Sequence, residues 1–317
     1  MPLKLDCILR ARDRIKPHVR RTPLERSGAL SVRTGCELFL KLENWQVTGS
    51  FKARGAINRL LTLSARERAK GIITASAGNH ALGVALAAQI CGAGGKIVLP
   101  LHASAAKKTA LGCYGLTLME QGNDYDEAEE IAWEIAEREN LTFVHAFEDP
   151  EIMAGQGTIA LEISEQLPDA GAVLVPIGGG GLISGIAVAA KALNPAIKVI
   201  GVQSEASPAM AAALEAGKVV ETPLQTSLAD GLTGRRVGEL TFQYVQKYVD
   251  DVILVSENSI RSAVKLLFET QHFVVEGSAA VGLAALLAEK VKTHGSTILV
   301  LTGRNIATNT FCEILAT

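Results

Sequence analysis

Lys52 is the residue whose surroundings point most directly to chemistry. It lies in the segment 48–56 (Thr-Gly-Ser-Phe-Lys-Ala-Arg-Gly-Ala), directly after Phe51 and among small residues. Partial burial beside an apolar ring lowers the pKa of a lysine and frees its amine to attack a carbonyl. Such an amine can form a Schiff base with an aldehyde cofactor, above all pyridoxal phosphate (PLP). For an isolated lysine, exposure at the start of a helix is the commoner situation, so other motifs must decide.

A run of glycines, Gly178 to Gly181, follows a predicted strand and precedes a predicted helix. Glycines at such a place let backbone N–H groups converge on an anion, and the helix N-terminus adds a favourable dipole. A phosphate fits this arrangement, and a flexible turn is the alternative. The dinucleotide pattern G-x-G-x-x-G fails, because its last position would be Ile183 or Ser184. The P-loop pattern also fails, because no Gly-Lys-Ser/Thr follows.

The segment from Ser76 to His80 (Ser-Ala-Gly-Asn-His) links a predicted strand to a predicted helix. Ligands of open α/β sheets lie at the carboxyl ends of the strands. The segment offers a hydroxyl, an amide and helix-start N–H groups, which together suit a carboxylate. Simple capping of the helix by Ser76 or Asn79 explains the same residues equally well.

Two further segments begin or end predicted elements. The segment 302–305 (Thr-Gly-Arg-Asn) ends the last strand, and Glu276 opens a helix, where a lone carboxylate usually complements the helix dipole. The histidines outside the 76–80 segment show no metal-ligand spacing, so we expect no metal site and interpret these side chains as structural or exposed: His18, His102, His145, His272 and His294.

Strands and helices alternate along the chain from residue 71. The predicted strands of a first series are 71–75, 96–100, 116–119 and 141–144, with helices over 80–91 and 103–111 and from a cap at Asp124. A second series has strands at 172–176, 198–202, 251–255 and 296–301. Strands separated by helices of this length indicate parallel sheets. We therefore expect two α/β units with a ligand cleft between them.

The composition bounds the class of protein. The chain has 317 residues, a formal net charge of -2 and 4% aromatic residues, which argues against a nucleic-acid-binding surface. The longest uncharged run, 172–190, contains the glycine run, which argues against a membrane helix. Residues 1–14 lack an apolar core of signal-peptide length, and the 5 cysteines are scattered with no C-x-x-C. We therefore expect reduced thiols and a cytoplasmic location.

Together the motifs resemble the threonine/serine dehydratase family of fold-type II PLP enzymes. The residues that carry the resemblance are 41–56, 76–80, 178–181 and 302–303, in matching order from about Arg20 onward. The resemblance implies a tryptophan synthase β-like fold of two open parallel-sheet α/β domains with the active site in the cleft. It implies a large domain of 1–65 plus 149–317, a small inserted domain of 66–148, a homodimer, and an amino-acid substrate.

The resemblance also implies roles for single residues. Lys52 would hold PLP as a Schiff base and act as the general base, with Phe51 against the ring. The remaining cofactor contacts would be Asn79 at the ring hydroxyl, Thr302 at the pyridine nitrogen, and Gly178, Gly179, Gly180, Gly181 and Leu182 at the phosphate. Ser76, with the backbone of Ala77, Gly78, Asn79 and His80, would bind the substrate carboxylate.

Departures from the family pattern narrow these expectations. Serine racemases of the family carry a second serine where this chain has Ala77, so we expect no racemisation. Members that bind a divalent cation carry acidic residues where this chain has Gln203 and Ala209. Arg304 replaces a glycine, and either it turns outward or its charge selects substrates with a further acidic or polar group. Arg304 and the segment 43–47 resemble a subgroup, the hydroxyectoine-utilisation dehydratases.

The predicted activity is PLP-dependent β-elimination from a β-hydroxy amino acid of the threonine/serine type, in hydroxyectoine catabolism for that subgroup. The products would be a keto acid and ammonia. A β-replacement synthase and a PLP-binding homologue without turnover are the alternatives. A nicotinamide oxidoreductase is a further one, weakened by the failed dinucleotide pattern.

Overall fold

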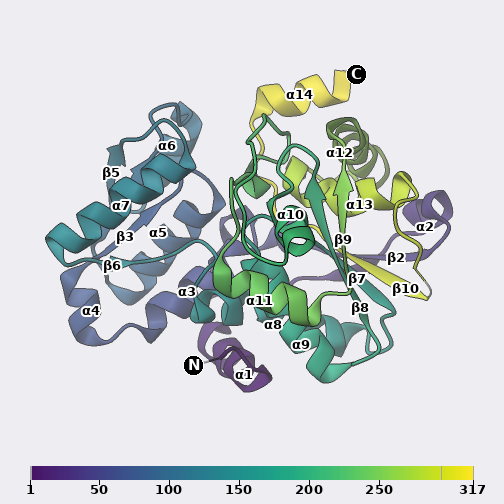
Figure 1. Cartoon of the computed structure of the whole chain (residues 1–317), viewed down its shortest axis with the longest axis horizontal. Helices are drawn as coiled ribbons and strands as arrows, with labels where there is room; N and C mark the ends of the chain where they lie inside the picture. Colours follow the sequence, from purple (N-terminus) through teal and green to yellow (C-terminus); the bar gives the residue numbers. More distant parts are fainter. Residues whose placement is uncertain (1, 294, 317) are drawn as a thin grey trace.

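The computed structural model describes residues 2–293 and 295–316, which form two parallel-sheet units side by side (Figure 1). A 6-stranded sheet has the order β1-β2-β10-β7-β8-β9, and a 4-stranded sheet has the order β5-β4-β3-β6. Within these sheets β1 pairs antiparallel to β2, and every other pairing is parallel. The sheets define what we call the larger and the smaller unit. The predicted fold class, two open parallel sheets, is confirmed.

The strands are β1 (Leu24–Arg26), β2 (Glu37–Lys41), β3 (Ile72–Ala75), β4 (Gly95–Leu99), β5 (Thr117–Glu120), β6 (Thr142–Phe143), β7 (Ala172–Pro176), β8 (Lys198–Ser204), β9 (Asp251–Val255) and β10 (Ser296–Val300). The α-helices are α1 (Leu5–Ile15), α2 (Gly28–Thr34), α3 (Lys52–Thr62), α4 (Ala65–Lys70), α5 (Asn79–Cys91), α6 (Ala105–Gly112), α7 (Tyr125–Glu139), α8 (Pro150–Gln166), α9 (Gly181–Leu193), α10 (Ala209–Ala216), α11 (Glu239–Tyr248), α12 (Glu257–Gln271), α13 (Gly277–Leu287) and α14 (Thr308–Ala316). Short 3-10 turns are η1 (Glu43–Trp45), η2 (Val47–Gly49) and η3 (Asp230–Leu232).

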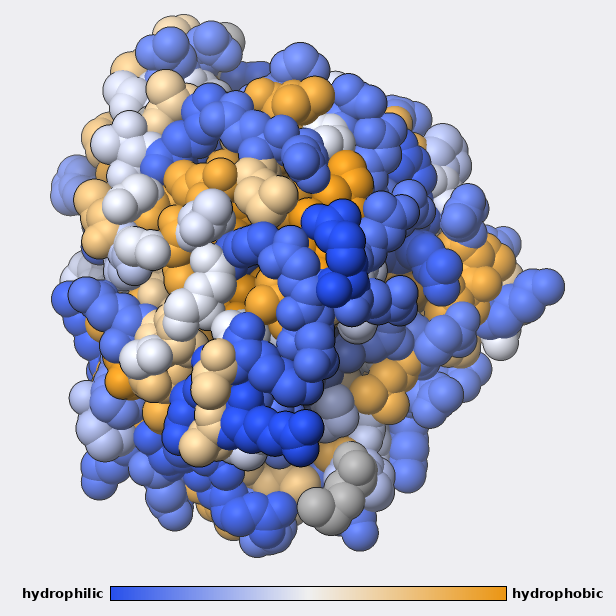
Figure 2. All heavy atoms as spheres, turned by 90° about the vertical axis from the view of Figure 1, so that its left-hand side faces the viewer, coloured by the Kyte–Doolittle hydropathy of each residue, from blue (hydrophilic) through white to orange (hydrophobic). Residues whose placement is uncertain are grey.

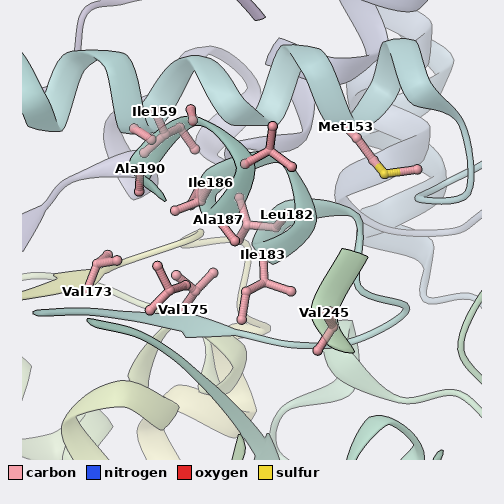
Figure 3. Close-up of a cluster of buried hydrophobic side chains, with 14 of the residues drawn as sticks. Met153, Ile159, Val173, Val175, Leu182, Ile183, Ile186, Ala187, Ala190 and Val245 are labelled. Atoms are coloured by element: carbon pink, nitrogen blue, oxygen red, sulfur yellow. The ribbon is translucent and has the colours of Figure 1, made fainter. Parts of the chain in front are cut away.

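Helices cover both faces of the larger sheet, as a parallel sheet requires. On one face α8, α9 and α11 pack over β7, and Figure 3 shows Ile183 and Ile186 of α9 next to the strand that carries Val173 and Val175. On the other face α12 and α13 bury a second apolar cluster. Helix α9 is buried almost all round, which is typical of a helix enclosed by other elements rather than a surface helix. Its start, at the glycine run, is thereby held in the middle of the molecule.

Helix α3 contacts both the smaller and the larger unit. Its apolar residues Ala56, Ile57 and Leu60 pack with α5 against the smaller sheet, whose other face is covered by α7. The opposite side of α3 contacts α8 through Arg54 and Asn58. The domain boundaries predicted after residues 65 and 148 stay a prediction, although all strands of the smaller sheet come from residues 72–143.

The structure adds strands that the sequence did not reveal. β1 and β2 extend the larger sheet beyond β10, but β1 has only 3 residues and pairs at an edge. Such a short edge strand carries too few residues for an alternating pattern. The later strands lie within a residue or two of their predicted positions, and Asp124 caps α7 as expected by accepting a hydrogen bond from the Glu127 N–H.

Within the described residues, no helix combines the length and hydropathy needed to cross a bilayer. Figure 2 shows the face of the molecule that carries the smaller unit, where hydrophilic residues are interspersed with separate apolar patches. Isolated apolar residues on a surface are normal and need no partner to explain them.

A buried ionic cluster anchors the start of α3. The Arg54 guanidinium donates to both oxygens of Glu43 at 2.8 Å and to Glu162 Oε1 at 2.7 Å. Lys41 Nζ donates to the other oxygen of Glu162 at 2.6 Å. Arg54, Lys41 and Glu43 are at most 1% exposed. Arg54 lies two residues after Lys52 in the same helix. The cluster therefore fixes the position of that lysine relative to β2 and α8.

Replacing Arg54 by alanine should lower the free energy of unfolding by about 3–5 kcal/mol, because Glu43 is left as an unpaired buried charge. Urea unfolding followed by circular dichroism measures the loss. Arg10→Ala is the matched control, since Arg10 pairs with Asp6 on the exposed face of α1 and should change stability by less than about 1 kcal/mol. A loss at Arg54 no larger than that at Arg10 would contradict the anchoring role.

Candidate active site

A cavity of about 520 Å³ lies between the two units. It is lined by the segments that follow the carboxyl ends of β3, β7 and β10, and by the start of α3, which is where ligands lie in open α/β sheets. The structure brings together in its lining almost every site residue predicted from the sequence: Phe51, Lys52, Ser76, Ala77, Gly78, Asn79, His80, Gly178, Gly179, Gly180, Gly181, Leu182 and Thr302.

Lys52 is positioned by the pairing of its loop with the end of β10. Ser50 forms an isolated bridge with Gly303, and the Phe51 N–H donates to the Thr302 carbonyl at 3.0 Å. Lys52 Nζ lies 5.5 Å from the centroid of the Phe51 ring and donates to the Ala146 carbonyl at 2.9 Å. Burial lowers the pKa of Lys52 to about 8, although the nearby Glu276 carboxylate opposes this shift. A much larger fraction of the amine is therefore neutral near neutral pH than in a free lysine.

The glycine loop packs so closely against neighbouring residues that side chains would not fit there. A Cβ on Gly179 would lie 2.4 Å from the ring of Phe147. Gly180 has φ +97° and a Cβ there would lie 2.8 Å from Thr241, whose hydroxyl donates to the Gly179 carbonyl at 2.6 Å. The loop runs directly into α9, whose first N–H groups lack intrahelical partners. Loop and helix start together form an anion cradle.

The segment 76–80 does not serve as a side-chain cap for α5. The N-cap of α5 is Gly78, and no side chain caps the helix there. Ser76 Oγ instead accepts from the Gly78 N–H at 3.1 Å within the loop. The alternative that Ser76 or Asn79 merely caps the helix is therefore wrong, and the first amides of α5 face a cavity that could hold a carboxylate.

His80 lies behind this loop and is almost fully buried. Burial lowers its pKa to about 3, so the ring is neutral at physiological pH. Its Nε2 lies 3.2 Å from the Val144 carbonyl, which fixes the ring rather than presenting it to the cavity as a charge. The backbone of His80 thus remains the part of this residue that is suited to a substrate carboxylate.

Asn79 contacts two residues that the sequence analysis did not assign to the site. Its Nδ2 donates to Glu276 Oε1 and Oε2 at 2.8 and 3.1 Å, and its Oδ1 accepts from Asn305 Nδ2 at 2.6 Å. Burial raises the pKa of Glu276 to about 7. The interpretation of Glu276 as a dipole complement is incomplete, because its side chain makes no cap bond and reaches Asn79 instead. A carboxylate that opens a helix with no other charged residue was the available signal.

Two buried hydroxyl groups in the cavity lining, Thr302 Oγ1 and Ser278 Oγ, have no hydrogen-bond partner among the described residues. Unpaired buried polar atoms are rare and usually indicate a missing ligand or water. The Thr302 hydroxyl and the glycine cradle therefore fit the ring nitrogen and the phosphate of PLP, and the Lys52 amine fits its aldehyde.

Arg304 is the predicted site residue that the structure does not bring into the cavity. It is exposed, and its N–H donates to the Gly49 carbonyl at 3.0 Å. The next residue, Asn305, lines the cavity in its place. The geometry favours the outward alternative, because Arg304 is exposed while Asn305 lines the cavity. A selective role for Arg304 gains no support from this position.

His145 and Gln203 have structural surroundings. His145 Nδ1 accepts from the N–H groups of Phe147 and Glu148, and burial, with Lys52 nearby, lowers its pKa to about 4. His294 lies outside the described residues. Gln203 Oε1 accepts from the N–H groups of Met210 and Ala211 at 3.0 Å, which ties β8 to α10. Across the part of the chain that the structure describes, no group of His, Cys, Asp and Glu side chains is arranged to hold a metal ion.

Comparisons with known proteins agree with this chemistry. The family described as "Pyridoxal-phosphate dependent enzyme" matches residues 15–303. The L-threonine ammonia-lyase of Thermotoga maritima is 47% identical over 314 residues, covering 99% of this chain and 78% of that protein. The catabolic L-threonine dehydratase of Escherichia coli K12 is 42% identical, covering 96% and 94%. The structure of maize serine racemase matches with a TM-score of 0.94 at 35% identity, covering 100% and 98%.

The buried Glu276 should make the stability of the apoprotein fall as pH rises. Because its pKa is about 7 in the folded state and near 4.5 when unfolded, the folded state holds the proton more tightly between these values. The stabilisation is complete below pH 4.5 and is lost as pH rises through 7. Glu276→Gln should therefore reduce the difference in unfolding free energy between pH 5 and pH 8 by up to roughly 3 kcal/mol.

Urea unfolding at fixed ionic strength measures the free energy of unfolding at pH 5 and at pH 8. Glu37→Gln is the control, because hydrogen bonds from Arg26 and Ser296 lower the pKa of the exposed Glu37 and give its contribution the opposite sign. Equal pH dependence in wild type and Glu276→Gln would show that Glu276 ionises normally.

Proposed function

This chain belongs to the family of pyridoxal-phosphate-dependent enzymes, and from that premise we propose that it is an ammonia-lyase that eliminates the β-hydroxyl of threonine or serine. The relatives named as L-threonine ammonia-lyase and L-threonine dehydratase support this substrate class. One observation carries the proposal. Lys52 lines the same cavity as the glycine cradle 178–181, which suits a phosphate, and the loop 76–80, which suits a carboxylate.

Each part of PLP has a matching group in the cavity. Lys52 would hold the aldehyde carbon, with Phe51 against the ring, and Gly178–Gly181 with Leu182 would hold the phosphate. Thr302 would face the pyridine nitrogen, and Asn79 the ring hydroxyl. When bound, PLP supplies a conjugated ring that withdraws electrons from the substrate Cα. A hydroxyl at the ring nitrogen, in place of a carboxylate, suits rapid loss of a β-substituent rather than a long-lived carbanion.

The chain's own residues account for substrate binding and proton transfer. The Ser76 hydroxyl and the first amides of the 77–80 segment would bind the substrate carboxylate. The Lys52 amine, with its pKa lowered to about 8, is the base that would take the Cα proton at Nζ. Loss of the β-hydroxyl as water then gives an enamine, which hydrolyses to a keto acid and ammonia.

Narrower expectations from the resemblance are part of the same proposal. They are a hydroxyectoine-derived amino acid as the natural substrate, a cytoplasmic location and a homodimer. A panel of threonine, serine, 3-hydroxyaspartate and hydroxyectoine-derived amino acids, assayed for keto acid, ranks the substrates. Size-exclusion chromatography with light scattering tests the dimer.

The elimination should proceed without racemisation. The methyl group of Ala77 cannot hold or deliver a proton, although a serine racemase is among the similar structures. Chiral chromatography of substrate recovered at partial conversion should show only the original enantiomer. Ala77→Ser should add a trace of the other enantiomer. Inversion by the wild type would contradict the assignment.

Lys52→Ala should abolish keto-acid formation while leaving the fold intact, because it removes both the anchor of the cofactor and the base. Borohydride treatment of the yellow holoenzyme should fix PLP to the peptide that contains Lys52, as detected by mass spectrometry. Label on another lysine would disprove the assignment. Added sulfide should leave the yield of keto acid unchanged, whereas a β-replacement synthase would consume the sulfide. A non-catalytic homologue would bind PLP but form no keto acid.

A further inference from the structure

The side-chain amide of Asn79 lies between an acceptor and a donor. Both carboxylate oxygens of Glu276 accept hydrogen bonds from the amide nitrogen of Asn79, at 2.8 and 3.1 Å. Asn305 Nδ2 donates to the amide oxygen at 2.6 Å. An asparagine amide has two nearly identical orientations that exchange its oxygen and nitrogen, so its neighbours decide which one is adopted.

The polarity of both neighbours is set by their own chemistry. Above its pKa of about 7 the Glu276 carboxylate is ionised and can only accept hydrogen bonds, so it requires the nitrogen of Asn79. Asn305 must present its own nitrogen, because the same Nδ2 also donates to the Thr48 carbonyl at 2.8 Å. A flipped Asn79 would place its oxygen against the carboxylate and its nitrogen against the nitrogen of Asn305. Both contacts would become repulsive, which leaves a single orientation.

A backbone contact holds Glu276 in place. The Glu276 N–H donates to the Gly303 carbonyl at 3.1 Å, which ties the start of α13 to the end of β10. A Cβ on Gly303 would lie 2.5 Å from Glu276 Oε1, so the glycine makes room for the carboxylate. Asn79 begins α5 of the smaller unit, whereas Glu276 and Asn305 belong to the larger unit. The hydrogen bonds therefore cross from one unit to the other beside the cavity.

We propose that Glu276 and Asn305 are positioning residues that lock the Asn79 amide in one orientation, so that its nitrogen serves as the donor to the ring oxygen of the cofactor. The inference rests on the proposed function, in which Asn79 contacts that oxygen. The nitrogen carries two hydrogens. With one held by Glu276, the other supplies the donor that this contact requires.

A double-mutant cycle in the apoprotein tests whether the lock exists. Asn79→Asp sets two carboxylates against each other and should lower the melting temperature. Glu276→Gln alone should not lower it, because a glutamine can still turn its oxygen to the Asn79 nitrogen. In the double variant the introduced glutamine can turn its nitrogen to the introduced carboxylate and should restore most of the loss. A double variant as unstable as Asn79→Asp would overturn the proposal.

The effect on the cofactor is measured by titrating apoprotein with PLP and recording the absorption spectrum of the bound form. Glu276→Gln removes one of the two contacts that set the orientation, so it should weaken PLP binding about threefold and shift the absorption maximum without lowering the melting temperature. Asn305→Ala removes the other contact and should weaken PLP binding and shift the spectrum to a similar extent. The double variant, although stable, should bind PLP as weakly as Asn79→Asp because position 79 has no donor.

Glu37→Gln and Asn258→Asp make matched changes at exposed positions and should leave affinity and spectrum unchanged. Wild-type affinity and an unshifted spectrum in Glu276→Gln and Asn305→Ala would overturn the positioning role even if the wild type forms keto acid. A wild-type protein that binds no PLP would instead overturn the proposed function, while the apoprotein cycle would still decide whether the lock exists.

Discussion

The buried ionic cluster around Arg54 is the constraint on which the rest of the site depends. Arg54 and Lys41 face Glu43 and Glu162 in a region closed to water, so each charge requires its partner. The residues come from β2, η1, α3 and α8, and their hydrogen bonds leave α3 a single position relative to the larger sheet. Lys52 begins that helix, so its place at the cavity follows from the cluster rather than from its own side chain.

The same exclusion of water prepares both titratable groups of the cavity. Burial lowers the pKa of Lys52 to about 8 and raises the pKa of Glu276 to about 7. Each shift moves the group toward its neutral form, as expected where charge is poorly solvated. The neutral amine is the reactive form of the lysine, whereas Glu276 must be ionised to act only as an acceptor. Neutral pH lies near both values, so both forms needed for the proposed chemistry coexist there.

The sequence predicted the parts of the site that local order along the chain determines. The segments 76–80, 178–181 and 302–303 each follow a strand, and the carboxyl ends of parallel strands must meet at one edge. Contacts between segments far apart in the chain could not be predicted from the sequence. Glu276 reaches Asn79 across 197 positions, and the sequence around residue 276 shows an isolated carboxylate without identifying its partner. Arg304 and Asn305 are adjacent in the chain, yet only Asn305 lines the cavity, where its side chain bonds Thr48 and Asn79.

The Lys52 loop and the 76–80 loop, which must face one substrate, are held together by a helix contact in addition to the hydrogen bonds from Asn305 to Thr48 and Asn79. A Cβ on Gly83 of α5 would lie 3.1 Å from the carbonyl of Lys52, so α5 packs directly on the backbone of the lysine. Helix α5 also begins at Asn79, at the end of the carboxylate-binding loop. Ion pairs of Arg235 with Asp124 and Asp126, and of Lys107 with Asp230, join the units at the outer part of the cleft. These outer pairs are partly exposed and individually weak. If the cleft opens, they would separate first, while the amine and the carboxylate-binding loop stay together because both are attached to the contact between α3 and α5.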